Sequence, residues 1–377
     1  MRALHVHSGN LYGGVETILR TIARRQADVP TTRHSFALCF PGRCADELAA
    51  AGASVTQLGA ARVRAPWTVL AARRRLTALL RAEQPDVIVT HAPWPHALFA
   101  PVARRCRVPI VSYLHTAAGG RHWLERWARR TPPDLVICVS HFVASTSHRL
   151  FPGVRAEVLY SPVEQPDGNS RTDKRSASLL PNAPTVMIQV SRMEAWKGHA
   201  VLIEALHALA GRGDWTCWIV GGAQRPEEAA YEQRLRARVD ALGLAERVHF
   251  LGQRDDVPAL LSRADICCQP NTGPEGLSIT FVEAIARGLP VVTTDIGGGP
   301  EVVMPGCGML VPPNDARALA EALGSLLDDP VRRAALGAAG PARAAELCDP
   351  ARQLGRLGDL LHAVVQGEVP APEDRPR

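Results

Sequence analysis

Two glutamates eight residues apart lie where a helix is expected to begin. Residues 271–292, NTGPEGLSITFVEAIARGLPVV, place Glu275 among turn-forming residues and Glu283 inside an apolar periodic run. Ser278 is a candidate N-cap, so we expect a short helix after it that stops at Gly288. Glu283 would then lie about one turn beyond the helix start. Both carboxylates can accept hydrogen bonds, so the pair could hold a ligand rich in hydroxyl groups.

The backbone between these glutamates is suited to an anion. The N–H groups of Gly276, Leu277 and Ser278 have no partner inside the helix, because they precede its first hydrogen-bonded turn. Such groups, together with the positive end of the helix dipole, favour a phosphate. A phosphate ester of a hydroxyl-rich molecule, such as a nucleotide sugar, would satisfy the N–H groups and both carboxylates. Loop glutamates and glycine-rich helix starts are also ordinary features of α/β proteins.

Two cations are expected near the end of another strand. The apolar run 185–190 continues into SRMEAWKGHAVLIEAL, which places Arg192 just past the strand and Lys197 just before a helix. Arginine offers a planar fork and lysine a point charge, a combination suited to a diphosphate. Either residue could instead be a solvated loop cation. Lys197 is harder to dismiss, since the only other lysine among 43 basic residues is Lys174.

The first candidate βα loop contains two adjacent glycines. In SGNLYGGVETILR, Gly13 and Gly14 lack side chains, so the backbone could approach a ligand closely at a helix start. A tight turn is the alternative. Neither GxxxxGK[ST] nor GxGxxG follows a predicted strand, which removes support for ATP hydrolysis and dinucleotide redox chemistry.

The elements that must position these residues form two series of alternating strands and helices. Such alternation predicts parallel sheets built from βα units. A segment at 161–184 is rich in Pro, Ser, Asp, Gly, Lys and Arg, and we interpret it as a linker. Stretches such as 15–25 and 68–81 have helical spacing. The predicted strands are 3–7, 35–40, 54–58, 87–90, 110–113, 135–139 and 157–159 before the linker, and 185–190, 217–220, 248–250, 266–269, 291–293 and 309–311 after it.

The length of the chain indicates two domains. Its 377 residues exceed what one hydrophobic core usually serves. We predict doubly wound domains at 1–165 and 183–349, a helix at about 350–366 that packs back on the first domain, and a disordered tail at 367–377. Ligands bind at the carboxyl ends of strands in such sheets, so the expected site is an interdomain cleft.

The composition is that of a soluble globular protein, with 46% hydrophobic and 21% charged residues. No apolar run reaches the roughly 18 residues of a transmembrane helix. The first residues lack the apolar core of a signal peptide. The nine cysteines form no CxxC pair, which argues against a disulfide framework or a zinc cluster, and adjacent Cys267 and Cys268 are expected in the core. We therefore expect a cytoplasmic protein.

The first half of the chain is basic. Residues 1–180 carry a net charge of +12, whereas the remainder carries −6. RHWLERWARR sets Trp123 and Trp127 on one helical face among arginines, and the candidate helix at Trp67 contains four more arginines. Basic amphipathic helices with tryptophan are attracted to anionic bilayers, which predicts peripheral binding to the inner face of the membrane. The alternative is that the tryptophans pack inside and the arginines form a solvated face.

Several segments together resemble glycosyltransferase family 4, the retaining enzymes of the GT-B fold. The resemblance is dense over residues 185–315 and sparser before them, and its most specific part is the E-x7-E pattern at Glu275 and Glu283. The segments are GGVE, SRMEAWKG, VGGA, RVHFLGQRDDVPALLSRADICCQPN, PEGLSITFVEAIARGLPVVTTDIGGGPEVV and GCGMLVPPND.

The resemblance implies roles for residues of the second domain, which would bind the nucleotide sugar. It implies that Arg192 and Lys197 hold the donor diphosphate. It also implies that Glu275 binds hydroxyls of the transferred sugar and that Glu283 binds the ribose. Arg192, Lys197 and Glu275 would act on the reacting groups and are counted as catalytic.

The resemblance also implies roles for two residues of the first domain, which would face the acceptor. His115, in VSYLHTAAGG, would lie near the reacting sugar and is counted as catalytic, and Gly14 would lie beside the phosphates. The chain departs from the usual pattern where His115 is followed by Thr rather than Asp, and where YSPVE replaces PNGVD.

The chemistry of sugar transfer fits these residues. The departing nucleoside diphosphate gains negative charge, which preorganised cations and N–H groups stabilise. The sequence contains no DxD motif, so Arg192 and Lys197 are expected to do this without a metal or other cofactor. In retaining members of such families the leaving phosphate is thought to take the acceptor's proton. The alternative is that Glu275 acts as a covalent nucleophile.

We therefore predict a retaining transferase of cell-surface polysaccharide or glycolipid synthesis. It would move a hexose-type sugar from a nucleotide diphosphate sugar to a glycan or lipid-linked acceptor, and we expect no nucleic-acid partner. Three alternatives stay open: a transferase with a small soluble acceptor, a nucleotide-sugar epimerase of similar fold, and a binding protein without catalysis.

Overall fold

The computed structural model describes residues 1–166, 184–303 and 306–368. The linker predicted at 161–184 and the tail predicted at 367–377 lie largely outside these described residues.

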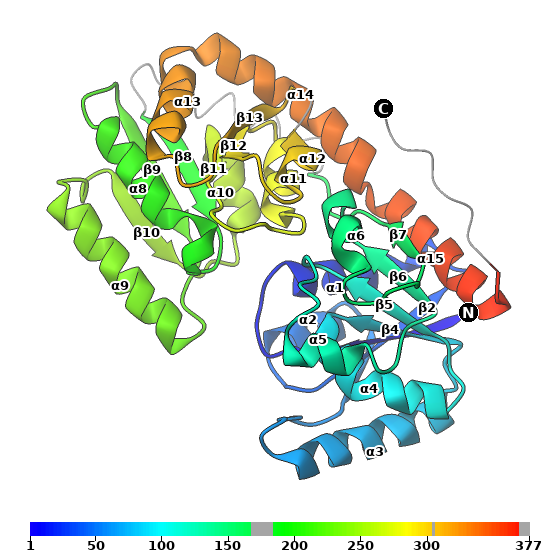
Figure 1. Cartoon of the computed structure of the whole chain (residues 1–377). Coiled ribbons are helices and arrows are strands. Elements are labelled where there is room, and N and C mark those ends of the chain that lie inside the picture. Colours follow the sequence, from blue (N-terminus) through cyan, green and yellow to red (C-terminus); the bar gives the residue numbers. More distant parts are fainter. Residues whose placement is uncertain (167–183, 304–305, 369–377) are drawn as a thin grey trace. The chain divides into compact units, whose positions relative to one another are not determined.

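Two compact units make up the chain. Unit 1 comprises Met1–Val163 and Cys348–Arg377, and unit 2 comprises Glu164–Leu347. Each unit contains one parallel sheet with helices packed against it (Figure 1). The two doubly wound α/β domains predicted from the sequence are therefore confirmed.

Unit 1 contains a seven-stranded parallel sheet with the strand order β3-β2-β1-β4-β5-β6-β7. The chain winds in one direction from β1 to β3 and in the other from β4 to β7, so β1 and β4 meet where the strand order reverses. In doubly wound sheets this reversal opens a crevice at the carboxyl ends of the strands. The strands are β1 (Arg2–His7), β2 (Arg33–Leu38), β3 (Ser54–Gln57), β4 (Val87–His91), β5 (Ile110–Leu114), β6 (Leu135–Cys138) and β7 (Ala156–Val158).

Helices cover the sheet of unit 1, and one of them comes from the end of the chain. The last helix packs against α1 and β4, and its Arg356 lies 3.4 Å from Glu157 of β7. Just before this helix, Cys348 O accepts a 3.0 Å bond from Val163 N. The helices of this unit are α1 (Gly14–Arg25), η1 (Gln26–Asp28), α2 (Arg43–Ala50), α3 (Pro66–Glu83), α4 (Pro93–Arg105), α5 (Trp123–Ala128), α6 (His141–Ser147) and α15 (Pro350–Gln366).

Unit 2 contains a six-stranded parallel sheet with the order β10-β9-β8-β11-β12-β13. The order reverses between β8 and β11, so the loops after these two strands are neighbours. The strands are β8 (Thr185–Val190), β9 (Trp215–Val220), β10 (Val248–Gly252), β11 (Ile266–Gln269), β12 (Val291–Thr294) and β13 (Gly308–Val311). The helices are η3 (Ala195–Lys197), α8 (His199–Ala208), α9 (Pro226–Ala241), α10 (Val257–Arg263), α11 (Ile279–Ala286), α12 (Gly299–Val303), α13 (Ala316–Asp328) and α14 (Pro330–Cys348).

The apolar runs of the sequence became buried strands because helices cover both faces of each sheet. Every predicted strand overlaps one that forms, with ends that differ by at most two residues. Cys267 and Cys268 are fully buried in β11, as the sequence predicted, and all nine cysteines are free. The helix predicted after Ser278 forms as α11, and Gly288, with φ of 74°, follows its end. Among the described residues, no helix combines the length and apolar character needed to cross a bilayer.

Candidate active site

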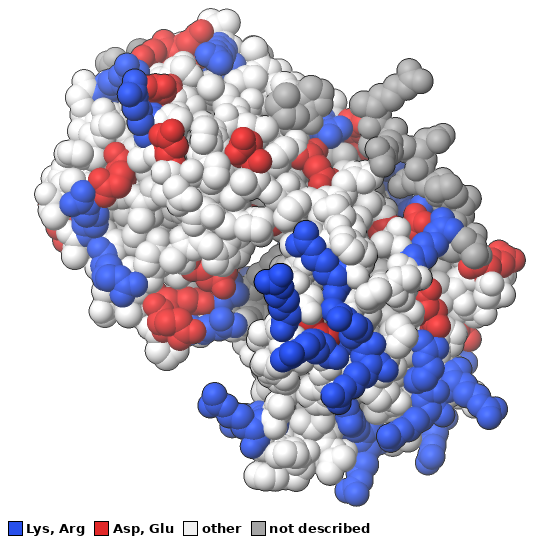
Figure 2. Space-filling model, in the orientation of Figure 1, with Lys and Arg blue, Asp and Glu red and all other residues white. Residues whose placement is uncertain are grey.

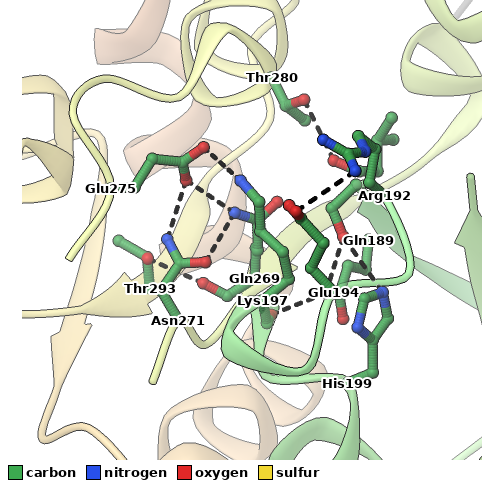
Figure 3. A network of polar contacts seen from close by, with 12 residues as sticks. Gln189, Arg192, Glu194, Lys197, His199, Gln269, Asn271, Glu275, Thr280 and Thr293 are labelled. Atoms are coloured by element: carbon green, nitrogen blue, oxygen red, sulfur yellow. Dashed lines mark hydrogen bonds and ion pairs between the residues drawn. The ribbon is translucent and has the colours of Figure 1, made fainter. Parts of the chain in front are cut away.

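The loops after β8 and β11 place two predicted site residues in contact. Because both strands are parallel neighbours, their carboxyl ends lie at the same edge of the sheet. The loop after β8 carries Lys197 in η3, and the loop after β11 carries Glu275 (Figure 3). The Lys197 ammonium forms an ion pair with Oε1 of Glu275, so the fold joins two residues 78 positions apart.

The other oxygen of the Glu275 carboxylate is held by two amides. Oε2 accepts a 2.9 Å bond from Nε2 of Gln269 and a 3.0 Å bond from Nδ2 of Asn271. The Gln269 amide also donates to Oδ1 of Asn271 at 2.9 Å. Both amide residues are buried. The Glu275 carboxylate is therefore fixed in position before any ligand arrives.

Lys197 is held as firmly as its partner. Its side chain is only 11% exposed, and its ammonium lies 4.2 Å from the ring centre of Trp196. Gln189 donates to its backbone carbonyl at 2.9 Å. The next residue, Gly198, has φ of 78°, and a Cβ there would lie 1.8 Å from the carbonyl oxygen of Pro270. Only glycine therefore allows the loop after β8 to pass this close to the loop after β11.

Arg192 also follows β8 but is engaged by carboxylates. Its Nη2 lies 3.3 Å from Oε1 of Glu194 and forms an ion pair with Oε1 of Glu228 on α9. Glu228 is buried and accepts a 2.7 Å bond from the backbone N–H of Gln224. A diphosphate that binds Arg192 would have to share the guanidinium with these carboxylates.

The remaining predicted residues of unit 2 lie at the start of α11. Gly276, Leu277 and Ser278 directly precede the helix and are buried, and Glu283 lies half-buried in its second turn. Ser278 occupies the N-cap position, but its hydroxyl caps no N–H group among the described residues. The glycine run after β12 holds the backbone of Glu275. Gly298 N donates a 2.8 Å hydrogen bond to Glu275 O. A Cβ on Gly297 would lie 2.4 Å from the same oxygen, so only glycine fits at that position.

Gly14 and His115, the predicted residues of unit 1, lie in the segments that follow β1 and β5. Gly14 is the first residue of α1. The helix start is fixed by Glu16, whose Oε2 accepts a 2.8 Å bond from Gly13 N and whose Oε1 lies 2.7 Å from Nε2 of His7. This buried pair joins the glycine loop to β1, since His7 is the last residue of that strand.

His115 directly follows β5 and stacks on Tyr113 with ring centres 4.6 Å apart. Its Nε2 lies 3.0 Å from Nδ1 of His91. Burial, with a smaller contribution from the charge of His7, lowers the pKa of His115 to about 3. The imidazole is therefore neutral at neutral pH, so it has one hydrogen-bond donor and one acceptor and carries no positive charge.

Sequence reasoning missed four residues that hold the predicted ones in place. Each had a local signal in the sequence. Gln269 ends the apolar strand ICCQ, and Asn271 follows it in QPN. Glu16 ends the GGVE motif, and Glu228 lies at the helix start PEEAAY.

Comparison with known proteins assigns both halves of the chain. Residues 12–165 match the family described as glycosyltransferase family 4, and residues 170–343 match the family described as glycosyl transferases group 1. A GDP-mannose-dependent alpha-(1-6)-phosphatidylinositol monomannoside mannosyltransferase of Mycolicibacterium smegmatis is 32% identical over 324 residues, which cover 79% of this chain and 83% of that protein.

Two further proteins show the same similarity. A phosphatidyl-myo-inositol mannosyltransferase of Mycobacterium leprae is 33% identical over 263 residues, which cover 68% of this chain and 67% of that protein. The HepE protein of Anabaena, solved in complex with UDP and glucose, is 25% identical and superposes with a TM-score of 0.82, covering 96% of this chain and 100% of that chain. The similarity thus extends over both units.

Proposed function

The chain belongs to glycosyltransferase family 4, and from this membership we propose that it transfers mannose from GDP-mannose to a phosphatidylinositol-based glycolipid. The GT-B fold and the glycosyltransferase class predicted from the sequence are confirmed. Nothing in the comparisons supports an epimerase. The observation that carries the proposal is the ion pair of Lys197 and Glu275 at the carboxyl ends of β8 and β11. The relatives described above, which are named mannosyltransferases, support mannose as the sugar.

The choice of GDP-mannose rests on the named relatives. The relative that is 32% identical across most of both chains is GDP-mannose-dependent, whereas the structure solved with UDP and glucose is 25% identical. The choice of a lipid-linked acceptor has the same support, since two of these relatives act on phosphatidylinositol derivatives. Membership of the family also supports retention of configuration at the anomeric carbon.

The site suggests how the bond between mannose and phosphate is broken. The Lys197 ammonium would exchange its carboxylate partner for an oxygen of the diphosphate as charge develops there. The Arg192 guanidinium would bind the diphosphate while it keeps its contacts with Glu194 and Glu228. Glu275, released from Lys197 but still held by Gln269 and Asn271, would accept hydrogen bonds from mannose hydroxyls. The leaving phosphate would take the acceptor's proton, so the reaction would need no separate base. Lys197 and Arg192 would neutralise the diphosphate in place of a metal.

The first test is the choice of donor. GDP-mannose should raise the melting temperature by a few degrees more than UDP-glucose or ADP-glucose at equal concentration, because a ligand present at 100 times its Kd stabilises the native state by about 2.7 kcal/mol. Transfer of labelled mannose from GDP-mannose to a phosphatidylinositol lipid should persist in EDTA. If UDP-glucose stabilises the protein more, the proposed donor is wrong, and loss of transfer in EDTA would contradict the metal-independent mechanism.

The surface of unit 1 supports docking on a membrane. Trp67 on α3 is 70% exposed and Trp123 on α5 is 49% exposed, so these two do not pack inside. Trp127 is half-buried and stacks with Trp123, and the Arg73 guanidinium lies 5.8 Å from a Trp127 ring centre, which joins α3 to α5. Figure 2 shows basic side chains gathered over unit 1. We propose that this surface binds anionic lipid on the cytoplasmic face of the membrane.

Not every arginine of this surface is available to lipid. Arg73 donates to Leu98 O at 2.7 Å, and Arg129 donates to Gly120 O at 3.1 Å, so both help to hold the fold. The arginines that are exposed and suited to substitution are Arg74, Arg81, Arg121, Arg126 and Arg130.

The second test is flotation with vesicles that contain anionic lipid. Wild type should float at low salt and not at high salt, because exposed charges are screened beyond about 10 Å at 0.1 M. Serine at the five arginines named above should abolish flotation, since each basic residue near an anionic surface contributes about 1 kcal/mol. The control variant replaces five exposed arginines of unit 2 and should float like wild type: Arg212, Arg234, Arg263, Arg317 and Arg332. Failure of wild type to float at low salt would favour a soluble acceptor.

A further inference from the structure

Four histidines of unit 1 form a continuous row across the centre of the sheet. The rings of His34, His5 and His91 come from the neighbouring strands β2, β1 and β4, and His115 follows β5. Nδ1 of His34 lies 2.9 Å from Nε2 of His5, and Nδ1 of His5 lies 2.8 Å from Nε2 of His91. Nδ1 of His91 lies 3.0 Å from Nε2 of His115. We call these four residues the histidine row.

Each ring in the histidine row is neutral. Burial lowers the pKa of His34 to about 4 and that of His115 to about 3, and it holds the pKa values of His5 and His91 well below their ordinary value. No group of three or more His, Cys, Asp or Glu side chains among the described residues could hold a metal ion. The short distances between ring nitrogens are therefore hydrogen bonds between neutral imidazoles.

Neutral imidazoles in such a row cannot choose their tautomers separately. A neutral ring carries one N–H and one lone pair, so an inner ring donates to one neighbour and accepts from the other. Because every contact joins an Nδ1 to an Nε2, all four rings must share one tautomer. The row is either Nε2–H throughout or Nδ1–H throughout.

The free end of the row selects between these two arrangements. Nδ1 of His115 is shielded from solvent and has no hydrogen-bond partner among the described residues. An Nδ1–H row would leave a buried N–H unpaired there, whereas an Nε2–H row leaves only an unfilled lone pair. Buried N–H groups without a partner are the rarer of the two in proteins. The neutral histidine side chain in water also prefers the Nε2–H form.

We propose that His5, His34 and His91 are positioning residues that lock His115 in the Nε2–H tautomer, so that its Nδ1 accepts a hydrogen bond from a hydroxyl of the bound substrate. The substrate half of this inference rests on the proposed function, because the sugar supplies the hydroxyl. The tautomer half concerns the free protein and stands on the ring contacts, the burial of the rings and the unpartnered Nδ1 of His115.

The tautomers can be read from the protein labelled with 15N-histidine. Two-bond proton–nitrogen correlation spectra distinguish Nδ1–H, Nε2–H and protonated rings, and single substitutions assign the signals. We expect all four rings of wild type to be Nε2–H at pH 7.5. His5→Phe removes both contacts at the centre of the row and should give His115 a mixture of tautomers. A wild-type His115 that is Nδ1–H or mixed, or one unchanged by His5→Phe, would overturn the lock.

A matched control and a milder variant guard against general damage. His96 is a buried histidine of the same unit that bonds Thr90 Oγ1 at 2.9 Å and Thr131 O at 2.8 Å, outside the row. His96→Phe should leave the His115 spectrum unchanged. His34→Phe removes only the last acceptor of the row and should also mix the tautomers of His115, so the lock remains testable if His5→Phe does not fold.

Kinetics test the substrate half. His5→Phe should lower kcat/KM for sugar transfer about tenfold, since one hydrogen bond to the substrate loses its fixed geometry. In His5→Gln the side-chain oxygen can accept from His91 and the amide can donate to His34, so this variant should recover most activity. If His115→Ala keeps wild-type activity, His115 makes no important contact to the substrate and the substrate half is wrong. The NMR spectra test the tautomer lock independently of this result. Absence of transfer by wild type from any donor would defeat the proposed function and leave the tautomer result intact.

Discussion

Replacing Lys197 by alanine is expected to lower the turnover number by about 10²-fold or more, with little change in fold. The ammonium is mostly buried, fixed by its own loop and paired with one carboxylate, so it is placed to exchange that partner for the departing diphosphate. A preorganised charge in a site with little water stabilises developing negative charge far more than the same charge in solvent. Steady-state transfer kinetics at saturating donor measure the effect.

A control substitution and a double variant test whether the lost ammonium itself slows the reaction. Lys174→Ala makes the same chemical change at the only other lysine and should leave turnover unchanged. Removal of Lys197 also leaves Glu275 without its cation, which could repel the donor. The double variant Lys197→Ala with Glu275→Gln removes that repulsion and should stay as slow as the single variant, or slower. Unchanged turnover in folded Lys197→Ala would show that the diphosphate is stabilised by other groups.

The parts of the site that the sequence predicted are those with a local pattern. Helical periodicity after Ser278 placed α11, and with it Glu283 on the helix and Glu275 in the loop before it. Each of these placements depends only on residues within a few positions. The same holds for Arg192 and Lys197, which follow an apolar run that had to be a strand.

The contacts among these residues depend on strand order, which no local pattern encodes. Lys197 meets Glu275 because β8 and β11 are neighbours at the reversal of the sheet. Arg192 looked free to hold a diphosphate, but Glu228 reaches it from a helix 36 positions along the chain. A long-range partner can therefore change the electrostatics of a residue whose local placement was predicted correctly.

The histidine row was missed for a related reason. The first strand, RALHVH, places His5 and His7 two residues apart, a spacing that in a half-exposed strand would indicate a solvated face. Both faces of this sheet are covered, so His5 and His7 are buried and must find partners inside. His5 finds them on β2 and β4, from residues 29 and 86 positions away. Because helices cover both faces of the sheet, the spacing of His5 and His7, which in the sequence resembled a solvated face, belongs to buried side chains.

The two glutamates of the E-x7-E pattern should separate in their kinetics. Glu275→Gln keeps the shape of the side chain but loses the charge that pairs with Lys197, and it presents an amide to the donors Gln269 and Asn271. We expect turnover to fall by about 10- to 100-fold, because a hydrogen bond to a charged group contributes about 1.5–3 kcal/mol and this one would act beside the reacting centre.

Glu283 lies in the second turn of α11, whereas Glu275 lies in the loop before this helix. The predicted ligand of Glu283 is the ribose, which takes no part in bond breaking. An interaction that is equally strong in the ground state and the transition state changes donor binding but not the chemical step. Glu283→Gln should therefore raise KM for GDP-mannose by about tenfold and leave the turnover number nearly unchanged. Measurement of both constants for both variants decides the matter. If the two substitutions alter kcat and KM alike, the division between a sugar ligand at Glu275 and a ribose ligand at Glu283 is wrong.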